Sequence, residues 1–240
     1  MSAVLYAAAD GVATLTLNRP DSRNALNLEM CDLVFGFCQD ISSNPEVKIV
    51  LVRANGPVLC AGADLKEREG MSEAQVRERR MKGFAAYAAL EALPMPVVAV
   101  VQGPAVGSGC EIAAACDFIV ATPEASFRTP EAIRGTVGAT QRLPRILGKR
   151  LAKDLMFTGR TLSAEEAREA GLITRLVSPS ELEITLGKIE KTILSAPAQS
   201  LRLAKRCIDR GVELDPEGAL AAEIAAIEEQ LAAGTWMGKK

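Results

Sequence analysis

The 240-residue chain contains no histidine, and this absence excludes several kinds of chemistry. A Ser-His-Asp triad, a histidine-bound metal and a histidine general base all need an imidazole. Aromatic residues make up only 4% of the chain, so a surface on which nucleic-acid bases stack is not expected. Carboxylates and backbone dipoles are the groups that remain for catalysis.

Cysteine spacing, apolar runs and net charge exclude further classes of protein. The six cysteines, at positions 31, 38, 60, 110, 116 and 207, form no C-x-x-C pair, and without histidine the usual zinc patterns fail. We interpret them as small buried thiols in a reducing compartment. The longest apolar runs, such as Val97–Val101, are too short to span a bilayer, and the residues from Met1 to Tyr6 do not resemble a signal peptide. With a net charge of −2, we predict a cytoplasmic protein without metal, membrane or nucleic-acid partner.

The hydrophobic pattern predicts an α/β fold with largely parallel strands and a helical tail. Alternation predicts a strand over Val12–Leu17, and β-branched runs predict strands over Val47–Val52, Val97–Val101 and Phe118–Ala121. The continuous run Val97–Val101 is typical of a strand buried on both faces. Helices are predicted from about Leu28 to Ile41, Ser72 to Glu91 and Gly109 to Cys116. After Gly135 we expect one short strand, Thr174–Val177, among helices at about 140–147, 150–157, 163–170, 181–194, 197–210 and 216–232.

Two turns rich in small residues are candidates for a binding site. The segment Cys60–Lys66 lets backbone approach a ligand closely, although a tight structural turn explains it equally well. In the turn Gly103–Glu111, Gly107-Ser108-Gly109 is followed by Ile112 where a dinucleotide fingerprint needs its third glycine. That turn therefore offers a different group, a backbone N–H near Ser108 at the positive end of a helix.

Two glutamates, Glu111 and Glu131, are candidates for acid–base chemistry. Each glutamate also has a non-catalytic explanation. Glu111 suits a surface position near the start of a helix, and Glu131, which follows Pro130, suits a solvated loop. Glu111, however, follows an apolar strand and precedes the apolar run 112–115, which indicates partial burial. A partly buried carboxyl group has a raised pKa and becomes a useful acid or base.

The ordered set of these motifs resembles the crotonase family, also called the enoyl-CoA hydratase/isomerase family, over about residues 10 to 210. No single motif carries the resemblance. It depends on the runs 17–20 (LNRP), 24–27 (NALN), 60–66 (CAGADLK), 109–111 (GCE), 116–117 (CD), 130–131 (PE), 140–144 (TQRLP), 157–160 (FTGR), 163–167 (SAEEA) and 171–172 (GL).

The resemblance implies a fold, a substrate class and a set of site residues. The expected fold is a spiral of ββα units over residues 1–195, followed by a helical region at 196–240 that forms trimers, often paired into hexamers. The expected substrate is an acyl-CoA thioester, with no metal or redox cofactor. Backbone N–H groups of Ala63 and Ser108 would form an oxyanion hole, although most relatives have glycine at the second position. The residues expected to contact coenzyme A are Arg23, Ala25, Ala61, Asp64, Leu65 and Lys66.

By the same resemblance, the reaction is syn addition of water to a 2-enoyl-CoA. Glu111 would activate the water for attack on C3, and Glu131 would deliver the proton to C2. An isomerase that moves a Δ3 double bond to Δ2, or another acyl-CoA reaction, would need only Glu131. Two departures bear on this choice. The loop Gly135–Thr140 is shorter than in relatives, and the chain ends at Gly238-Lys239-Lys240 where relatives continue with a helix. We therefore expect a truncated C-terminal region or a differently closed site.

Two alternatives lie outside acyl-CoA chemistry. Some crotonase relatives bind RNA, and the basic run Arg77–Lys82 is a candidate contact, although interspersed glutamate favours an ordinary solvated helix face. A purely structural role would have to explain why both glutamates accompany an intact small-residue turn.

Overall fold

The computed structural model describes residues 2–234. Met1 and residues 235–240 lie outside the described part of the chain. The expectations for the N-terminal residue and for the end at Gly238–Lys240 therefore have no structural counterpart here.

The main sheet has six strands, and most of its pairs are parallel. Its spatial order is β1 (Val4–Ala9), β2 (Val12–Leu17), β3 (Ile49–Ala54), β4 (Val97–Val101), β6 (Phe118–Ala121) and β9 (Arg175–Leu176). Only the β1–β2 hairpin is antiparallel within this sheet. The predicted parallel pairing is confirmed. Strand β1 was not predicted, because its alanine-rich sequence carries little strand propensity.

A smaller sheet of three short strands lies beside the first. It is formed by β5 (Pro104–Val106), β7 (Ser126–Arg128) and β8 (Thr161–Ser163), in that order. Strands of three residues are too short to show an alternating pattern, so the sequence did not reveal them. The expectation of a single strand after Gly135 is therefore wrong, since β8 precedes β9.

The predicted helices are present, with shifted ends. They are α1 (Leu28–Ser43), α2 (Glu73–Glu91), α3 (Ser108–Ala114), α4 (Arg142–Thr158), α5 (Ala164–Glu169), α6 (Leu182–Ser195), α7 (Ala198–Gly211) and α8 (Pro216–Ala232), with short 3₁₀ turns at Pro20–Ser22 and Ala132–Arg134. The two helices predicted at 140–147 and 150–157 are halves of α4, which bends at Gly148 (φ 75°, ψ 157°). A capping box between Ser72 and Gln75 begins α2.

Both faces of the main sheet are covered by apolar side chains. Alternate residues of β3 and β4 point to opposite sides, so Ile49 and Leu51 share a cluster with Leu182 and Leu186 of α6, whereas Val50 and Val52 join the larger core. Every residue of β4 is buried, which confirms the interpretation of Val97–Val101. The carboxyl ends of these strands lead into the turns that carry the candidate site.

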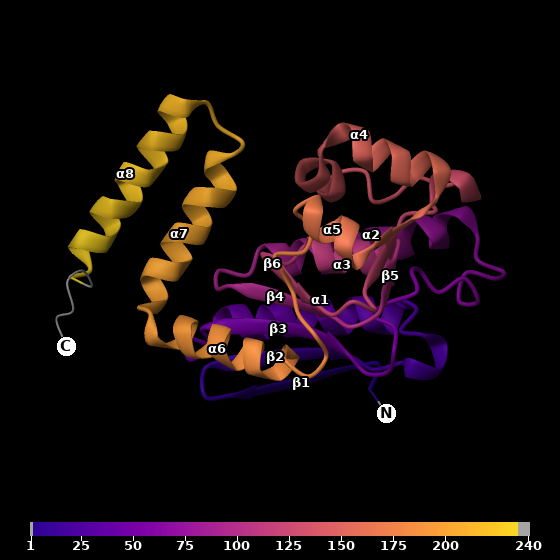
Figure 1. Ribbon diagram of the computed structural model, residues 1–240, viewed down its shortest axis with the longest axis horizontal. Coiled ribbons are helices and arrows are strands. Elements are labelled where there is room, and N and C mark those ends of the chain that lie inside the picture. The colour runs from indigo at the N-terminus through magenta and orange to yellow at the C-terminus, as the bar shows by residue number, and fades with distance from the viewer. Residues whose placement is uncertain (1, 235–240) are drawn as a thin grey trace.

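Helices α7 and α8 extend from the rest of the molecule as a pair (Figure 1). Each buries one residue, Leu203 in α7 and Ala226 in α8. Large apolar side chains stay exposed along both helices and in the connection between them: Ile208, Val212, Leu214, Leu220, Ile224, Ile227 and Leu231. The predicted division at residue 195 falls between α6 and α7, and it stays a prediction.

The cysteines are free, and five of the six are buried. Cys207 is half-buried and is the exception to the expectation of buried thiols. Burial raises the pKa of Cys38 to about 12 and that of Cys60 to about 12, so these thiols stay protonated and act as small apolar groups. Within residues 2–234, no helix combines the length and apolar character needed to cross a membrane.

Candidate active site

Two small-residue turns lie against each other at the centre of the candidate site. The N–H of Val106 donates to the carbonyl of Cys60 at 2.9 Å, and the N–H of Leu59 donates to the carbonyl of Pro104 at 3.0 Å. Glycine is required at position 109, because a Cβ there would lie 2.5 Å from the Cys60 carbonyl oxygen. The close approach brings the turn that holds Ala63 next to the turn that holds Ser108.

The backbone N–H groups of Ala63 and Ser108 have no acceptor among residues 2–234. Around Ala63, the neighbouring groups are bonded instead. Leu26 donates to the Gly62 carbonyl and Asp64 donates to the Leu26 carbonyl, both at 2.8 Å. Ser108 is the first residue of α3, where an N–H has no intrahelical partner. Both residues line a cavity of about 420 Å³.

Glu111 lies in the same cavity and is held by an arginine that sequence reasoning did not single out. The residue is 6% exposed, and its Oε2 accepts a hydrogen bond from Nη1 of Arg142 at 2.7 Å. The other guanidinium nitrogen, Nη2, donates to Glu91 at 2.6 Å. The hydrogen bond to the guanidinium holds the Glu111 side chain in a fixed orientation. The signal for Arg142 was its place in the 140–144 motif.

Glu131 lies in a different environment. Its Oε2 is buried without a hydrogen-bond partner among the described residues. Burial raises the pKa of Glu131, and the nearby charge of Glu111 adds to the rise. Two glycines enclose the side chain: a Cβ on Gly107 (φ 51°) would lie 2.4 Å from Oε1, and one on Gly138 would lie 3.1 Å from Cγ. One carboxyl is thus charge-paired and the other favours its proton, the contrast that separates a base from an acid.

Tyr87 of α2 connects these groups and was not predicted. Its hydroxyl is hydrogen-bonded to the side chain of Ser108, and its ring lies 6.0 Å from the Arg142 guanidinium. Burial raises the pKa of Tyr87 well above its ordinary value, so the phenol stays neutral. The sequence showed only an ordinary apolar position of a helix. The hydroxyl of Ser108, absent from a glycine, is what gives Tyr87 a partner.

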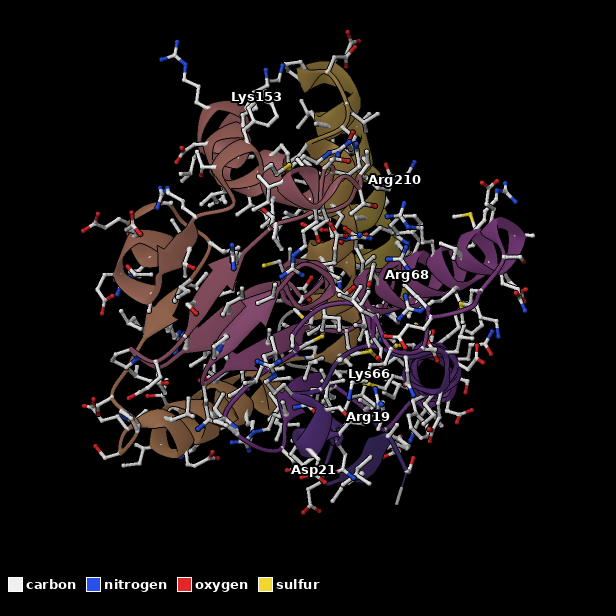
Figure 2. All side chains as sticks on the ribbon, turned by 90° about the vertical axis from the view of Figure 1, so that its right-hand side faces the viewer. Arg19, Asp21, Lys66, Arg68, Lys153 and Arg210 are labelled. Carbon is white, nitrogen blue, oxygen red and sulfur yellow. The ribbon has the colours of Figure 1, made fainter. Side chains whose placement is uncertain are left out.

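Of the residues expected to contact coenzyme A, Ala61 and Leu65 line the cavity, whereas Arg23, Ala25, Asp64 and Lys66 do not. Lys66 is exposed and lies on the same face as Arg19 and Arg68 (Figure 2). The carbonyl of Arg23 accepts a hydrogen bond from Ala61 at 3.0 Å, which attaches its loop to the turn. Whether these residues bind coenzyme A stays a prediction.

The contacts of Asp64 indicate a structural role for this residue. Its Oδ2 is 2.9 Å from Nη1 of Arg19, and its Oδ1 accepts from the N–H groups of Lys66 and Glu67 at 3.1 and 3.3 Å. Burial is the largest single influence and opposes ionisation, but the hydrogen bonds from Arg19, Glu67 and Lys66 and the charge of Arg19 together outweigh it, so the pKa of Asp64 is lowered. The carboxylate therefore fixes the turn after Ala63.

The basic run of α2 does not form one continuous surface. Arg79 is buried, with its Nε 2.7 Å from Glu67, and Lys82 pairs with Asp32 at 2.9 Å. Among the residues that the structure describes, no three Asp, Glu or Cys side chains are grouped closely enough to hold a metal ion.

Comparison with known proteins places this geometry in context. The model of the enoyl-CoA hydratase/isomerase family matches residues 7–234. A putative enoyl-CoA hydratase/isomerase of Bacillus subtilis, YngF, is 39% identical over 224 residues, covering 92% of this chain and 86% of that protein. A short-chain-enoyl-CoA hydratase of Clostridium acetobutylicum is 39% identical over 225 residues, covering 91% and 85%. The crystal structure of an enoyl-CoA hydratase from Bacillus anthracis superimposes with a TM-score of 0.90 at 35% identity, covering 94% and 90%.

Proposed function

Because the chain belongs to the enoyl-CoA hydratase/isomerase family, or crotonase family, and has its fold, we propose that it hydrates a 2-enoyl-CoA thioester. The main support for the proposal is that two carboxyl groups in one cavity differ in their hydrogen-bond partners and in their surroundings. Glu111 is paired with Arg142, whereas Glu131 has an unpartnered oxygen and a raised pKa. Two unpaired N–H groups line the same cavity.

In the proposed reaction, the thioester carbonyl accepts hydrogen bonds from the N–H groups of Ala63 and Ser108. Ionised Glu111 takes a proton from water as the water oxygen bonds to C3, and the π electrons move onto the carbonyl oxygen. The enolate then collapses as Glu131 gives its proton to C2. We propose that both carboxyl groups act on the same face of the double bond, which makes the reaction a syn hydration. Every step uses these groups and water, so the proposal includes no metal or redox cofactor.

The test is the loss of the conjugated enoyl absorbance of crotonyl-CoA. We expect hydration by the wild type, and a fall of about 10²–10⁴-fold in kcat for Glu111→Gln and for Glu131→Gln, since each removes a proton-transfer group. Glu165→Gln is the matched control, because Glu165 is exposed on α5 and lies outside the cavity. An inactive wild type, or full activity in either active-site variant, would contradict the proposal.

One observation favours a second activity, isomerisation of a 3-enoyl-CoA to the 2-enoyl isomer. Among the described residues, Oε2 of Glu131 is the carboxyl oxygen that is buried without a hydrogen-bond partner, and a single acid–base group suffices to move a proton between C4 and C2. The assay is the gain of conjugated absorbance from a 3-enoyl-CoA. If isomerisation dominates, Glu111→Gln retains it and Glu131→Gln abolishes it. Equal loss in both variants would exclude a one-carboxyl isomerase.

We further propose that α7 and α8 form a subunit interface in a homotrimer or a hexamer. The exposed apolar residues along both helices support this, since such a surface costs free energy in water unless another surface covers it. Light scattering of the purified protein tests it, and a monomeric mass would exclude it. The cytoplasmic assignment likewise stays a proposal, supported by the six free cysteines, and is checked by fractionation of source cells.

A further inference from the structure

The cavity of the proposed site is lined by an unusual number of arginines: Arg68, Arg79, Arg80 and Arg134. One of them is neutralised locally, because Nε of Arg79 lies 2.7 Å from a carboxylate oxygen of Glu67. The other three form no ion pair with any residue in the described part of the chain. A guanidinium stays charged at every physiological pH, so three positive charges border the cavity.

The carboxyl groups of the cavity do not balance that charge. Only Glu111 and Glu131 among its lining residues are acidic. Glu111 is already paired with Arg142 at 2.7 Å. Burial favours the protonated, uncharged form of Glu131 by raising its pKa. The cavity therefore carries an excess of positive charge that a bound anion would neutralise.

Two of the three unpaired arginines are attached to the segment that carries Glu131. Arg134 ends the 3₁₀ turn that begins directly after Glu131, and its N–H donates to the Pro130 and Glu131 carbonyls, both at 3.1 Å. The Arg80 guanidinium donates to Oγ1 of Thr136, whose N–H donates to the Glu131 carbonyl at 2.9 Å. The charges of both guanidinium groups are near enough to the Glu131 carboxyl to lower its pKa, in opposition to burial. Since Glu131 is proposed to act on C2 of the acyl group, we assign both arginines to the acyl end. Arg68 instead follows the Ala63–Lys66 turn in the chain.

We propose that Arg80 and Arg134 form an anion subsite that selects acyl-CoA thioesters whose acyl group ends in a carboxylate. This rests on the proposed function, which places the acyl chain beside Glu131. Guanidinium groups bind carboxylates through two parallel charge-assisted hydrogen bonds, so a terminal carboxylate suits the pair better than a methyl group does. A phosphate of coenzyme A offers the same chemistry, and the test separates the two sources.

The test measures binding and not turnover, so it stays informative if hydration fails. Calorimetry gives Kd for two unreactive saturated thioesters: glutaryl-CoA, whose acyl chain ends in a carboxylate, and butyryl-CoA, whose chain ends in a methyl group. We expect the wild type to bind glutaryl-CoA about tenfold more tightly than butyryl-CoA. This ratio is near the lower end of what one charge-assisted hydrogen bond contributes to affinity. Arg134→Gln and Arg80→Gln should each bring the ratio of the two Kd values close to one.

Arg77→Gln is the matched control, because Arg77 is an exposed arginine of α2 outside the cavity, and it should keep the wild-type ratio. Arg134 is exposed and its side chain forms no hydrogen bond or ion pair with the described residues, so Arg134→Gln is interpretable even if Arg80→Gln misfolds. A wild-type ratio near one overturns the proposal. So does an Arg134→Gln protein that loses affinity for both thioesters by the same factor, because that result assigns the arginine to coenzyme A phosphates. Hydration of crotonyl-CoA, measured separately, decides the proposed function.

Discussion

Replacing Arg142 by glutamine is the most direct test of how Glu111 is prepared for catalysis. The substitution keeps a polar side chain of moderate length but removes the charge that lies 2.7 Å from the Glu111 carboxylate. Glu91, which contacts the same guanidinium at 2.6 Å, provides the comparison. We expect loss of the guanidinium to disturb Glu111 much more than loss of Glu91 does.

The expected magnitudes follow from burial. The side chains of the inner pair are 17% exposed for Arg142 and 8% for Glu111, whereas Glu91 is 54% exposed. Removing one partner of a buried pair costs about 3–5 kcal/mol, and the partial exposure of Arg142 places the expected loss near about 3 kcal/mol. Removing an exposed partner costs at most about 1 kcal/mol. Arg142→Gln should therefore destabilise the protein by about 2 kcal/mol more than Glu91→Gln.

Urea unfolding gives the stability difference, and crotonyl-CoA hydration gives the activity. With a mispositioned base, Arg142→Gln should lower kcat by about tenfold or more while KM changes little, since a well-placed general base contributes about 10²–10⁴-fold. Arg142→Lys, which keeps the charge, should recover part of the loss. The reasoning is refuted if both variants lose the same stability, or if Arg142→Gln retains the wild-type kcat.

Two further substitutions test Glu131 and its surroundings. Because burial raises the pKa of Glu131, the native state loses stability as the pH rises through that pKa. Glu131→Gln should therefore be more stable than the wild type at neutral pH, and the difference should vanish below the ordinary glutamate pKa of about 4.3; a pH-independent difference in urea unfolding would contradict this. Gly107→Ala and Gly70→Ala each place alanine at a positive φ, which costs about 1–2 kcal/mol. Only the new Cβ at position 107 would contact Glu131, because it would lie 2.4 Å from Oε1. Activity should fall in the first variant alone, and equal activities would show that Glu131 tolerates the displacement.

Local chemistry explains which elements were predictable. Runs of β-branched residues predict the strands β3, β4 and β6, and the capping box that begins α2 can be recognised in the sequence. The kink at Gly148 also left a sign, because the helical pattern divided there into two parts. In each of these cases the stabilising interactions lie within a few residues of one another along the chain.

The missed strands show the opposite case. β5, β7 and β8 are three residues each, and they exist because they pair with one another across the chain, as Ala105 pairs with Phe127 and Phe127 with Leu162. The pair of Arg142 with Glu111 has the same origin, since 31 residues separate the two. Asp64 shows that a sequence motif does not predict the role of every side chain in it. Asp64 was expected to contact coenzyme A, but its carboxylate pairs with Arg19 and it does not line the cavity.

Composition and motif order were enough to exclude histidine-based chemistry and to place this protein in a family. A chain without histidine has few other groups for proton transfer. The order of the motifs along the chain can be read directly from the sequence and identifies the family. The tertiary structure alone decided how the two glutamates differ, which N–H groups stay unpaired and where the unneutralised arginines lie. These properties depend on burial and on the nearest charge, and both are set by residues that are distant in the chain and adjacent only after folding.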